Sequence, residues 1–353
     1  MEVTGLPFEM KHVQLGNHAF EGLNNCYVLG TEPDAETTLV DTGVSTPETR
    51  EQLEDGLAGH GLSFADVDRI LLTHHHGDHV GLAGEIQAES GASVHVHEGD
   101  APLVRGDPGA EAAMRDRMET LFDAWGMPDG PREELLAFLD RGDVTGTDPD
   151  VTTFEDGERF DIGSVALEAV HLPGHSVGLS GFRFEGTRGP ELFSGDALLP
   201  YYTPNVGGAD VRVESPLANY LETLTRIIDA DYARAWPGHR GAIVDPSGRA
   251  ADIVVHHRDR TDRIVDYLRE SGPADAWTVS AHLFGGLSSI HILHGPGEAY
   301  AHLGHLEEGG VVESGARGAD SREYVLVDPD PDLDGLFPAV ARGKDPSDIP
   351  GHE

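Results

Sequence analysis

The chain has 353 residues, 38% of them hydrophobic and 25% charged, and this composition excludes a mostly disordered protein. At about 150 residues per domain, the length allows two to three domains. No run approaches about 18 consecutive apolar residues and residues 1–3 lack a basic start, so we expect neither a membrane span nor a secretory signal and place the protein in the cytoplasm. The single cysteine, Cys26, excludes an intrachain disulfide and a cysteine-based zinc site, so any metal would be held by histidine and carboxylate.

The charge of the chain is strongly acidic. Asp and Glu number 63 against 24 Lys and Arg, which gives a net charge of −39, and the lysines are Lys11 and Lys344 alone. Charge at this density repels itself in dilute buffer and is tolerated where salt screens it, over roughly 3 Å at 1 M. The composition therefore resembles that of proteins from salt-accumulating halophiles. It also disfavours nucleic acid as a partner, because a phosphate backbone would be repelled.

Predicted strands and helices alternate along the first part of the chain. Apolar and β-branched runs predict strands at 24–30, 38–41, 67–73 and 93–97. The spacing of apolar residues predicts helices at 47–60 and at about 80–89. This alternation is typical of a layered α/β fold, in which helices cover the faces of a sheet.

Residues from about 101 to 150 differ, because they contain two helical patterns and no strand pattern, and we interpret them as a helical insertion. The two helices are expected at 111–126 and 132–141. Strands are then predicted at 159–161, 165–171, 181–184, 191–194 and 233–236. Before the last of them, the segment 216–228 has one apolar stripe and predicts a helix packed on the sheet.

Beyond residue 245 the pattern changes to helices at 249–270, 278–284 and 297–308, followed by short strands at 311–313 and 324–327. That order is typical of a winged helix. The third helix carries Glu298, Glu307 and Glu308 and no Lys or Arg, so we expect it to line a substrate channel or a homodimer interface rather than to bind DNA. The sequence thus predicts units at 1–245 and 246–330 and a solvated acidic tail at 331–353.

Metal-competent side chains cluster directly after the predicted strand at 67–73. His74, His76, Asp78 and His79 lie within six residues. On a tight loop, His74 and His76 can face one ion while Asp78 and His79 turn toward a second point a few ångströms away. One short loop can therefore serve two cations, and His75 between them should point away.

Further candidate ligands follow the ends of other predicted strands. His175 lies in a glycine-flanked turn, Asp196 follows an apolar strand through Ser and Gly, and His239 follows another strand through Pro and Gly. We expect these three to complete a two-metal site, with the two carboxylate oxygens of Asp196 bridging the cations.

These motifs resemble the metallo-β-lactamase superfamily, with its HxHxDH loop, a PGH-type third histidine, an SGD-type aspartate and a late PGH histidine, and the resemblance spans residues from about 10 to 245. It implies an αββα sandwich. It further implies that one metal is bound by His74, His76 and His175. The other is then bound by Asp78, His79 and His239, with Asp196 bridging the two and Asp41 orienting the ligands from behind.

Two divalent cations about 3.5–4 Å apart can share a hydroxide and polarise a carbonyl or phosphoryl group, so hydrolysis is the expected reaction. Asp78 is both a candidate ligand and a candidate acceptor that orients the nucleophilic water. We expect zinc, with iron or manganese as alternatives. Relatives that run di-iron redox chemistry with a flavin partner carry Glu where this chain has His76.

The resemblance leaves the substrate open. We expect a small acyl thioester or related ester, as in glyoxalase II. The alternatives are an endoribonuclease of the β-lactamase-like protein 2 kind, whose branch carries a C-terminal winged helix, an iron-dependent persulfide dioxygenase, and a non-catalytic metal-stabilised binding module. The insertion and the segment 198–212 should overhang the site, with Tyr201, Tyr202 and Asn205 lining the substrate pocket.

Overall fold

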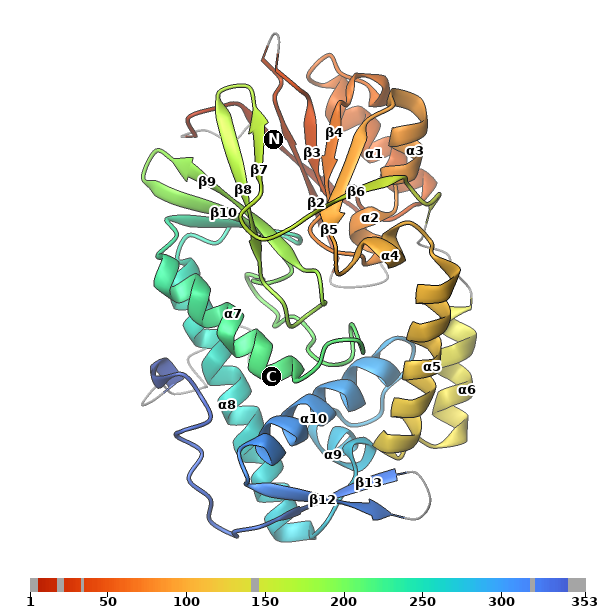
Figure 1. Cartoon of the computed structure of the whole chain (residues 1–353), viewed down its shortest axis with the longest axis vertical. Coiled ribbons are helices and arrows are strands. Elements are labelled where there is room, and N and C mark those ends of the chain that lie inside the picture. Colours follow the sequence, from red (N-terminus) through yellow and green to blue (C-terminus); the bar gives the residue numbers. More distant parts are fainter. Residues whose placement is uncertain (1–5, 18–21, 33–34, 141–145, 318–320, 342–353) are drawn as a thin grey trace.

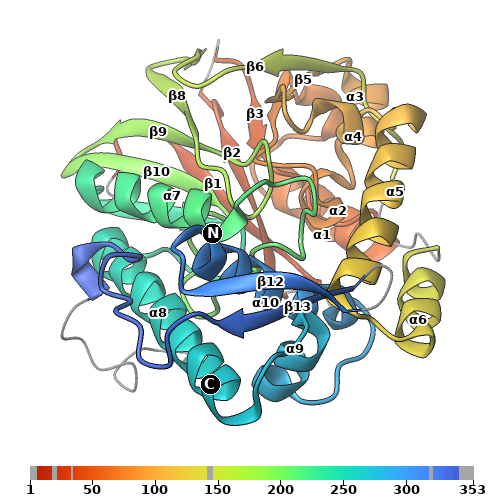
Figure 2. The same ribbon diagram turned by 60° about the horizontal axis from the view of Figure 1, so that its bottom comes forward.

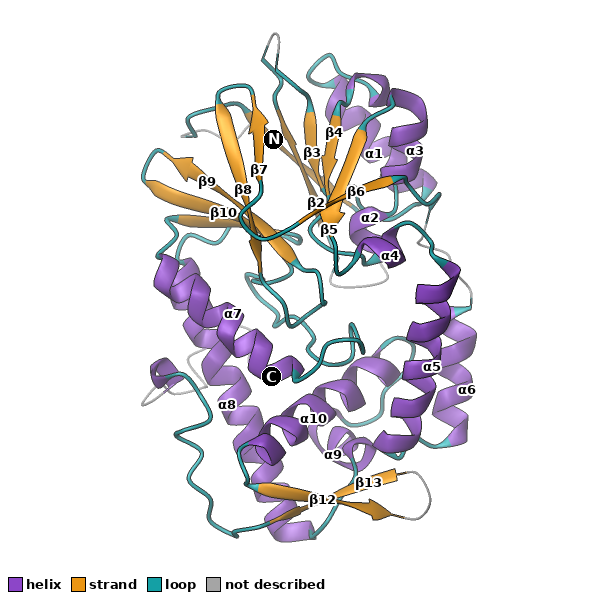
Figure 3. Cartoon of the chain, viewed as in Figure 1, coloured by secondary structure: helices purple, strands orange, loops and turns teal. Residues whose placement is uncertain are grey.

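The computed structural model describes residues 6–17, 22–32, 35–140, 146–317 and 321–341. Two β-sheets pack face to face at one end of the molecule, and a mainly helical region occupies the other end (Figures 1 and 3). The residues between the sheets are largely aromatic and buried, among them Phe154, Phe182, Phe193 and Trp236. This confirms the predicted α/β sandwich fold.

The larger sheet has six strands and contains Cys26 in its buried second strand. Its strands, in spatial order, are β1 (Met10–Leu15), β2 (Asn24–Leu29), β3 (Thr38–Val40), β4 (Arg69–Leu71), β5 (Ser93–His97) and β6 (Val151–Phe154). The first two pairings are antiparallel, and β3 to β6 run parallel. Its outer face is covered by α1 (Pro47–Ala58), α3 (Ala83–Ser90) and α4 (Ala101–Val104).

The second sheet has five strands, and only the pairing of β10 with β11 is parallel. In spatial order they are β11 (Arg234–Pro237), β10 (Gly189–Gly195), β9 (Ser180–Gly186), β8 (Val165–His171) and β7 (Arg159–Ile162). Helices α7 (Pro216–Ala230) and α8 (Pro246–Ser271) pack against its outer face. The apolar stripe predicted for the first of these helices is the surface that it buries.

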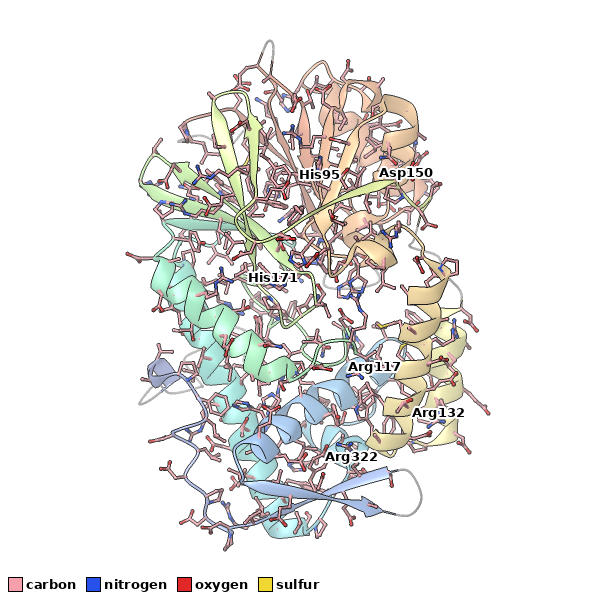
Figure 4. All side chains as sticks on the ribbon, viewed as in Figure 1. His95, Arg117, Arg132, Asp150, His171 and Arg322 are labelled. Atoms are coloured by element: carbon pink, nitrogen blue, oxygen red, sulfur yellow. The ribbon has the colours of Figure 1, made fainter. Side chains whose placement is uncertain are left out.

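The insertion and the C-terminal helices share one hydrophobic core. Helices α5 (Pro108–Trp125) and α6 (Asp129–Leu139) stand beside α9 (Ala276–Phe284) and α10 (His291–Glu308), as Figure 2 shows. Phe122 and Trp125 pack there in one buried cluster with Ile292 and Leu303. Arg117, labelled in Figure 4 on the side of α5 that faces α10, donates from Nε to the carbonyl of Val211 over 2.5 Å.

The end of the chain differs from its prediction at two points. The helix expected at 297–308 begins at His291, so the sequence Gly295-Pro296-Gly297 lies inside a helix. Close packing outweighs the low helix propensity of these residues: a Cβ on Gly297 would lie 2.4 Å from Gly208 Cα. The predicted tail is also not simply solvated, because Leu333 and Phe337 are buried, and residues 342–353 lie outside the described part.

The C-terminal elements follow the predicted order: three helices come first, and a hairpin of β12 (Val312–Arg317) and β13 (Ser321–Leu326) follows them. The winged-helix assignment itself stays a prediction.

Strands β1 and β6 were not predicted, and both lie at the edges of the larger sheet. Within the described residues, no helix combines the length and the apolar composition that crossing a bilayer requires.

Trp125→Ala should destabilise the protein, because the fully buried indole joins the insertion to the C-terminal helices. We expect a loss of about 3–5 kcal/mol in the free energy of unfolding, measured by urea titration. The control Val244→Ala removes a side chain that is 81% exposed and should change this free energy by less than about 0.5 kcal/mol. Equal effects of the two substitutions would contradict the shared core.

Candidate metal centre

Five loops at one end of the sandwich bring the candidate residues together. Asp41 follows β3, and the turn after β4 leads through His74 into the short helix α2 (Gly77–Val80). His175 follows β8, Asp196 follows β10, and His239 follows β11. Because neighbouring parallel strands end at the same edge of a sheet, residues far apart in the sequence meet here.

The first cluster consists of His74, His76 and His175. Nδ1 of His76 lies 2.9 Å from Nε2 of His74 and 3.0 Å from Nε2 of His175. The opposite nitrogen of each ring faces a fixed partner. His76 Nε2 is 3.0 Å from the carbonyl of Ala209, and His175 Nδ1 is 2.8 Å from the carbonyl of Asn205.

These partners determine which nitrogen of each ring carries the proton. A carbonyl oxygen only accepts, so His76 Nε2 and His175 Nδ1 must donate, and their inward nitrogens keep lone pairs. The hydroxyl of Thr73 donates to Asp41 over 2.9 Å, so its oxygen accepts from His74 Nδ1 at 3.0 Å. Three lone pairs therefore converge and cannot form hydrogen bonds with one another, which is an arrangement that suits a bound cation.

The second cluster consists of Asp78, His79 and His239. Oδ2 of Asp78 lies 3.8 Å from Nε2 of His79 and 3.5 Å from Nε2 of His239. The outer nitrogens are again held, because His79 Nδ1 donates to Asp41 over 2.9 Å and His239 Nδ1 donates to the carbonyl of Gly22 over 3.1 Å. Both inner nitrogens are buried and have no hydrogen-bond partner among the described residues.

Asp196 lies between the two clusters. Its Oδ2 is 3.3 Å from His239 Nε2, 3.5 Å from His79 Nε2 and 3.8 Å from His175 Nε2. Its other oxygen, Oδ1, is buried without a hydrogen-bond partner in the described structure. A Cβ at residue 238 would lie 2.4 Å from this oxygen, so glycine is required before His239. One carboxylate can therefore reach ions held by either cluster.

Asp41 supports both clusters from behind. It is buried, and its Oδ1 accepts from the backbone N–H of Thr73 over 2.8 Å, while Oδ2 receives Thr73 Oγ1 and His79 Nδ1. Its backbone has a φ of 58°, a left-handed conformation that Asp tolerates better than most residues. The carboxylate thus sets the direction of His74, through Thr73, and of His79 directly.

The surroundings divide the histidines electrostatically. Burial lowers the pKa of His74, His76 and His175, which keeps these rings neutral and able to act as ligands. Burial also opposes the charged form of His79, but the carboxylates of Asp196, Asp78 and Asp41 outweigh it and raise the pKa of that ring well above its ordinary value. The pKa of His239 is raised in the same way. Burial opposes the charged form of this ring too, and Asp196 makes the largest contribution in favour of it.

Two asparagines in the site were not predicted from the sequence. Nδ2 of Asn17 and Nδ2 of Asn24 each donate to Asp78 Oδ2 over 3.2 Å. They hold the carboxylate oxygen that faces His79 and His239. The signal available in the sequence for Asn24 was the amide pair Asn24-Asn25 at the start of a strand that continues with Cys, Tyr, Val and Leu, whereas Asn17 lies outside β2 and had no such signal.

The clusters form one wall of a cavity of about 730 Å³. Much of the facing wall is apolar and comes from the insertion, the C-terminal helices and the connection between α9 and α10, through Met114, Met118, Leu139, Phe284, Leu287, Ile290 and Leu293. Arg240, Arg260 and His294 are among the polar residues that line it. The volume is within the range of small-molecule sites, about 300–1,000 Å³.

The predicted pocket residues lie in different surroundings. Tyr202 and Asn205 line the cavity, whereas Tyr201 is not among its lining residues and is 48% exposed, so its predicted place in the pocket is wrong. Tyr201 instead packs edge-to-face on Tyr202. His256 from α8 also lines the cavity.

Other histidines near the site have partners elsewhere. His75 points away from the clusters, and its Nδ1 lies 3.2 Å from Asp100. His171, labelled in Figure 4 at the end of β8, stacks on His97 with ring centroids 4.2 Å apart. His95, labelled among the strands, packs against Phe160. His75 thus points away as expected, and His95, His97 and His171 contribute ring packing within the sandwich.

Comparison with known proteins agrees with this geometry. The model of the metallo-β-lactamase superfamily matches residues 19–239. The probable metallo-hydrolase YqjP of Bacillus subtilis is 25% identical over 288 residues, which cover 78% of this chain and 86% of that protein. A β-lactamase-like protein 2 homologue of Drosophila melanogaster is 27% identical and covers 69% of this chain and 68% of its own length.

Solved structures show the same relationship. A metallo-β-lactamase family protein from Thermus thermophilus superposes with a TM-score of 0.75 at 32% identity, over 90% of this chain and 98% of that one. A β-lactamase domain protein from Burkholderia ambifaria gives a TM-score of 0.76 at 26% identity, over 90% and 92% of the two chains. The chain therefore belongs to the metallo-β-lactamase superfamily and is a metal-dependent hydrolase of that fold.

Proposed function

We propose that the protein binds two divalent cations, most simply zinc, and hydrolyses an acyl thioester or related ester. The observation that carries the proposal is the convergence of the three imidazole lone pairs of the first cluster, whose outer nitrogens are all tied to acceptors. The first cluster would hold one cation and the second cluster the other, and Asp196 lies within reach of both. Three histidines and a shared carboxylate match the ligand preferences of zinc.

When bound, such a pair of cations supplies a hydrolytic nucleophile at neutral pH and polarises the carbonyl of the substrate. The chain itself contributes acceptors and shape. Asp78, fixed by the amides of Asn17 and Asn24, is positioned to accept a hydrogen bond from the attacking water. The apolar wall opposite excludes water and leaves room for an acyl group.

The shape and charge of the site favour a small acyl substrate over RNA. The net charge of −39 opposes the approach of a phosphate backbone, and α10 contains no Lys or Arg. From the sequence we expected Glu298 to be one of the repelling charges of this helix, but its side chain is buried and paired with Arg260, so it contributes little to the surface. The same net charge supports a protein adapted to high salt, where screening is strong.

Purified in about 1 M NaCl, the protein should contain about two transition-metal ions per chain by elemental analysis.

His74→Ala and Asp196→Ala should each reduce hydrolysis by more than about 100-fold, because loss of a ligand should exceed the 10–100-fold cost of losing its supporting partner. Both variants should keep the far-ultraviolet circular dichroism of the parent. His75→Ala is the matched control from the same loop and should keep both ions and most activity. One ion per parent chain, or none, would contradict the two-metal proposal.

A panel of acyl thioesters, lactones and single-stranded RNA, scored for turnover that a chelator abolishes, tests the substrate class. We expect thioesters to be hydrolysed best.

Leu287→Trp should lower kcat/KM for long acyl chains more than for an acetyl group, because the indole would occupy part of the cavity. Val244→Trp, at an exposed position outside the lining, is the control. Chelator-sensitive cleavage of RNA without thioester turnover would contradict the proposal.

A further inference from the structure

One short loop, residues 205–209 between β10 and α7, touches two histidines of the first cluster at its two ends. The carbonyl of Asn205 accepts from His175 Nδ1 over 2.8 Å. Four residues later, the carbonyl of Ala209 accepts from His76 Nε2 over 3.0 Å. The distance between these two carbonyls therefore decides how the two rings are turned toward each other.

The side chain of Asn205 closes this loop on itself. Its Oδ1 accepts from the backbone N–H of Gly208 over 3.1 Å and from that of Ala209 over 2.7 Å. Gly207 has a φ of +90°, which glycine alone adopts readily, so the chain can reverse between the two carbonyls. The loop thus has one defined shape that depends on an amide group within it.

The closed loop is in turn fixed to α10. Nδ2 of Asn205 donates to Glu298 Oε2 over 2.9 Å and to the carbonyl of His294 over 3.1 Å. The backbone N–H of Val206 donates to the same Oε2 over 3.2 Å. At this contact the backbones approach closely, since a Cβ on Gly208 would lie 2.6 Å from His294 Cα.

Glu298 is itself held rigidly as an anion. It is buried, and its Oε1 receives the guanidinium of Arg260 from α8. Burial disfavours its charged form, but Arg260 together with His302 and His257 outweighs burial and keeps the pKa of this carboxyl well below its ordinary value. A buried carboxylate with both oxygens occupied is a fixed anchor for the donors of the loop.

We propose that Asn205 and Glu298 are positioning residues through which helix α10 sets the affinity of the first cluster for its cation. The inference rests on the proposed metal centre and adds an asymmetry to it. The second cluster does not use this loop, because the outer nitrogens of His79 and His239 are held by Asp41 and by the carbonyl of Gly22. Loosening the loop should therefore weaken one cation site and spare the other.

The test measures each site alone. In a His79→Ala background the second cluster is broken, and in a His74→Ala background the first is broken. The full-length metal-free variants are titrated with Zn²⁺ against a chromophoric chelator. Asn205→Ala should lower Zn²⁺ affinity about 10–100-fold in the first background, as loss of a ligand's supporting partner does, and leave it unchanged in the second.

Matched controls separate positioning from general damage. Asn219→Ala removes an amide that donates to the carbonyl of Glu214 at the start of α7, away from the loop, and should change neither affinity. Glu298→Gln is the second variant and should repeat the effect of Asn205→Ala. Its control is Glu307→Gln on the same helix, where the carboxylate accepts from Ser314 instead. Thermal unfolding identifies any variant that fails to fold.

A second readout uses the reciprocity of linked equilibria: if docking of α10 strengthens Zn²⁺ binding, Zn²⁺ binding must strengthen docking of α10. Amide hydrogen exchange in α10 should therefore slow when Zn²⁺ is added to the His79→Ala variant, and slow less when Asn205→Ala is combined with it.

In the Zn²⁺ titrations, equal loss of affinity in the His79→Ala and His74→Ala backgrounds, or no loss in the His79→Ala background, would overturn this inference alone. A parent protein that takes up no cation would overturn the proposed function and this inference with it.

Discussion

Five imidazole rings at one end of the sandwich each donate from one nitrogen to a fixed acceptor and so turn the other nitrogen inward. The acceptors are carbonyl oxygens, a threonine hydroxyl and the carboxylate of Asp41. The inward nitrogens cannot satisfy one another, and such groups are costly to bury. The rest of the structure can be understood from this constraint, because each acceptor must be held in place by the strand end, loop or helix that carries it.

The two halves of the molecule contribute different things to the site. Segments that follow strands of the sandwich, including the short helix α2, carry all the residues of both clusters and Asp196. The insertion and the C-terminal helices carry none of them, yet they supply much of the apolar wall of the cavity. They also join in a single core, so a change in the packing of Phe122 or Trp125 alters the cavity as well as stability. Substrate preference can therefore change without a change in the clusters.

Local pattern was enough to predict most elements and the members of the clusters, because strand periodicity and the HxHxDH spacing depend on neighbours in the sequence. The features that pattern did not predict depend on distant contacts. Pro296 lies within a helix because the neighbouring glycine packs against Gly208. Tyr201 points outward although its neighbour lines the cavity. Asn205, expected to meet the substrate, instead uses its side chain within the protein.

The buried cysteine of β2 makes the molecule convenient for spectroscopy. Cys26 is the only thiol in the sequence and is fully enclosed, and burial together with the nearby Asp41 raises its pKa, so the reactive thiolate is scarce. A cysteine introduced at an exposed site would therefore take a maleimide dye or spin label without removal of the native one. Labels on α6 and β13 could then report distances between the insertion and the C-terminal hairpin in an otherwise unaltered chain.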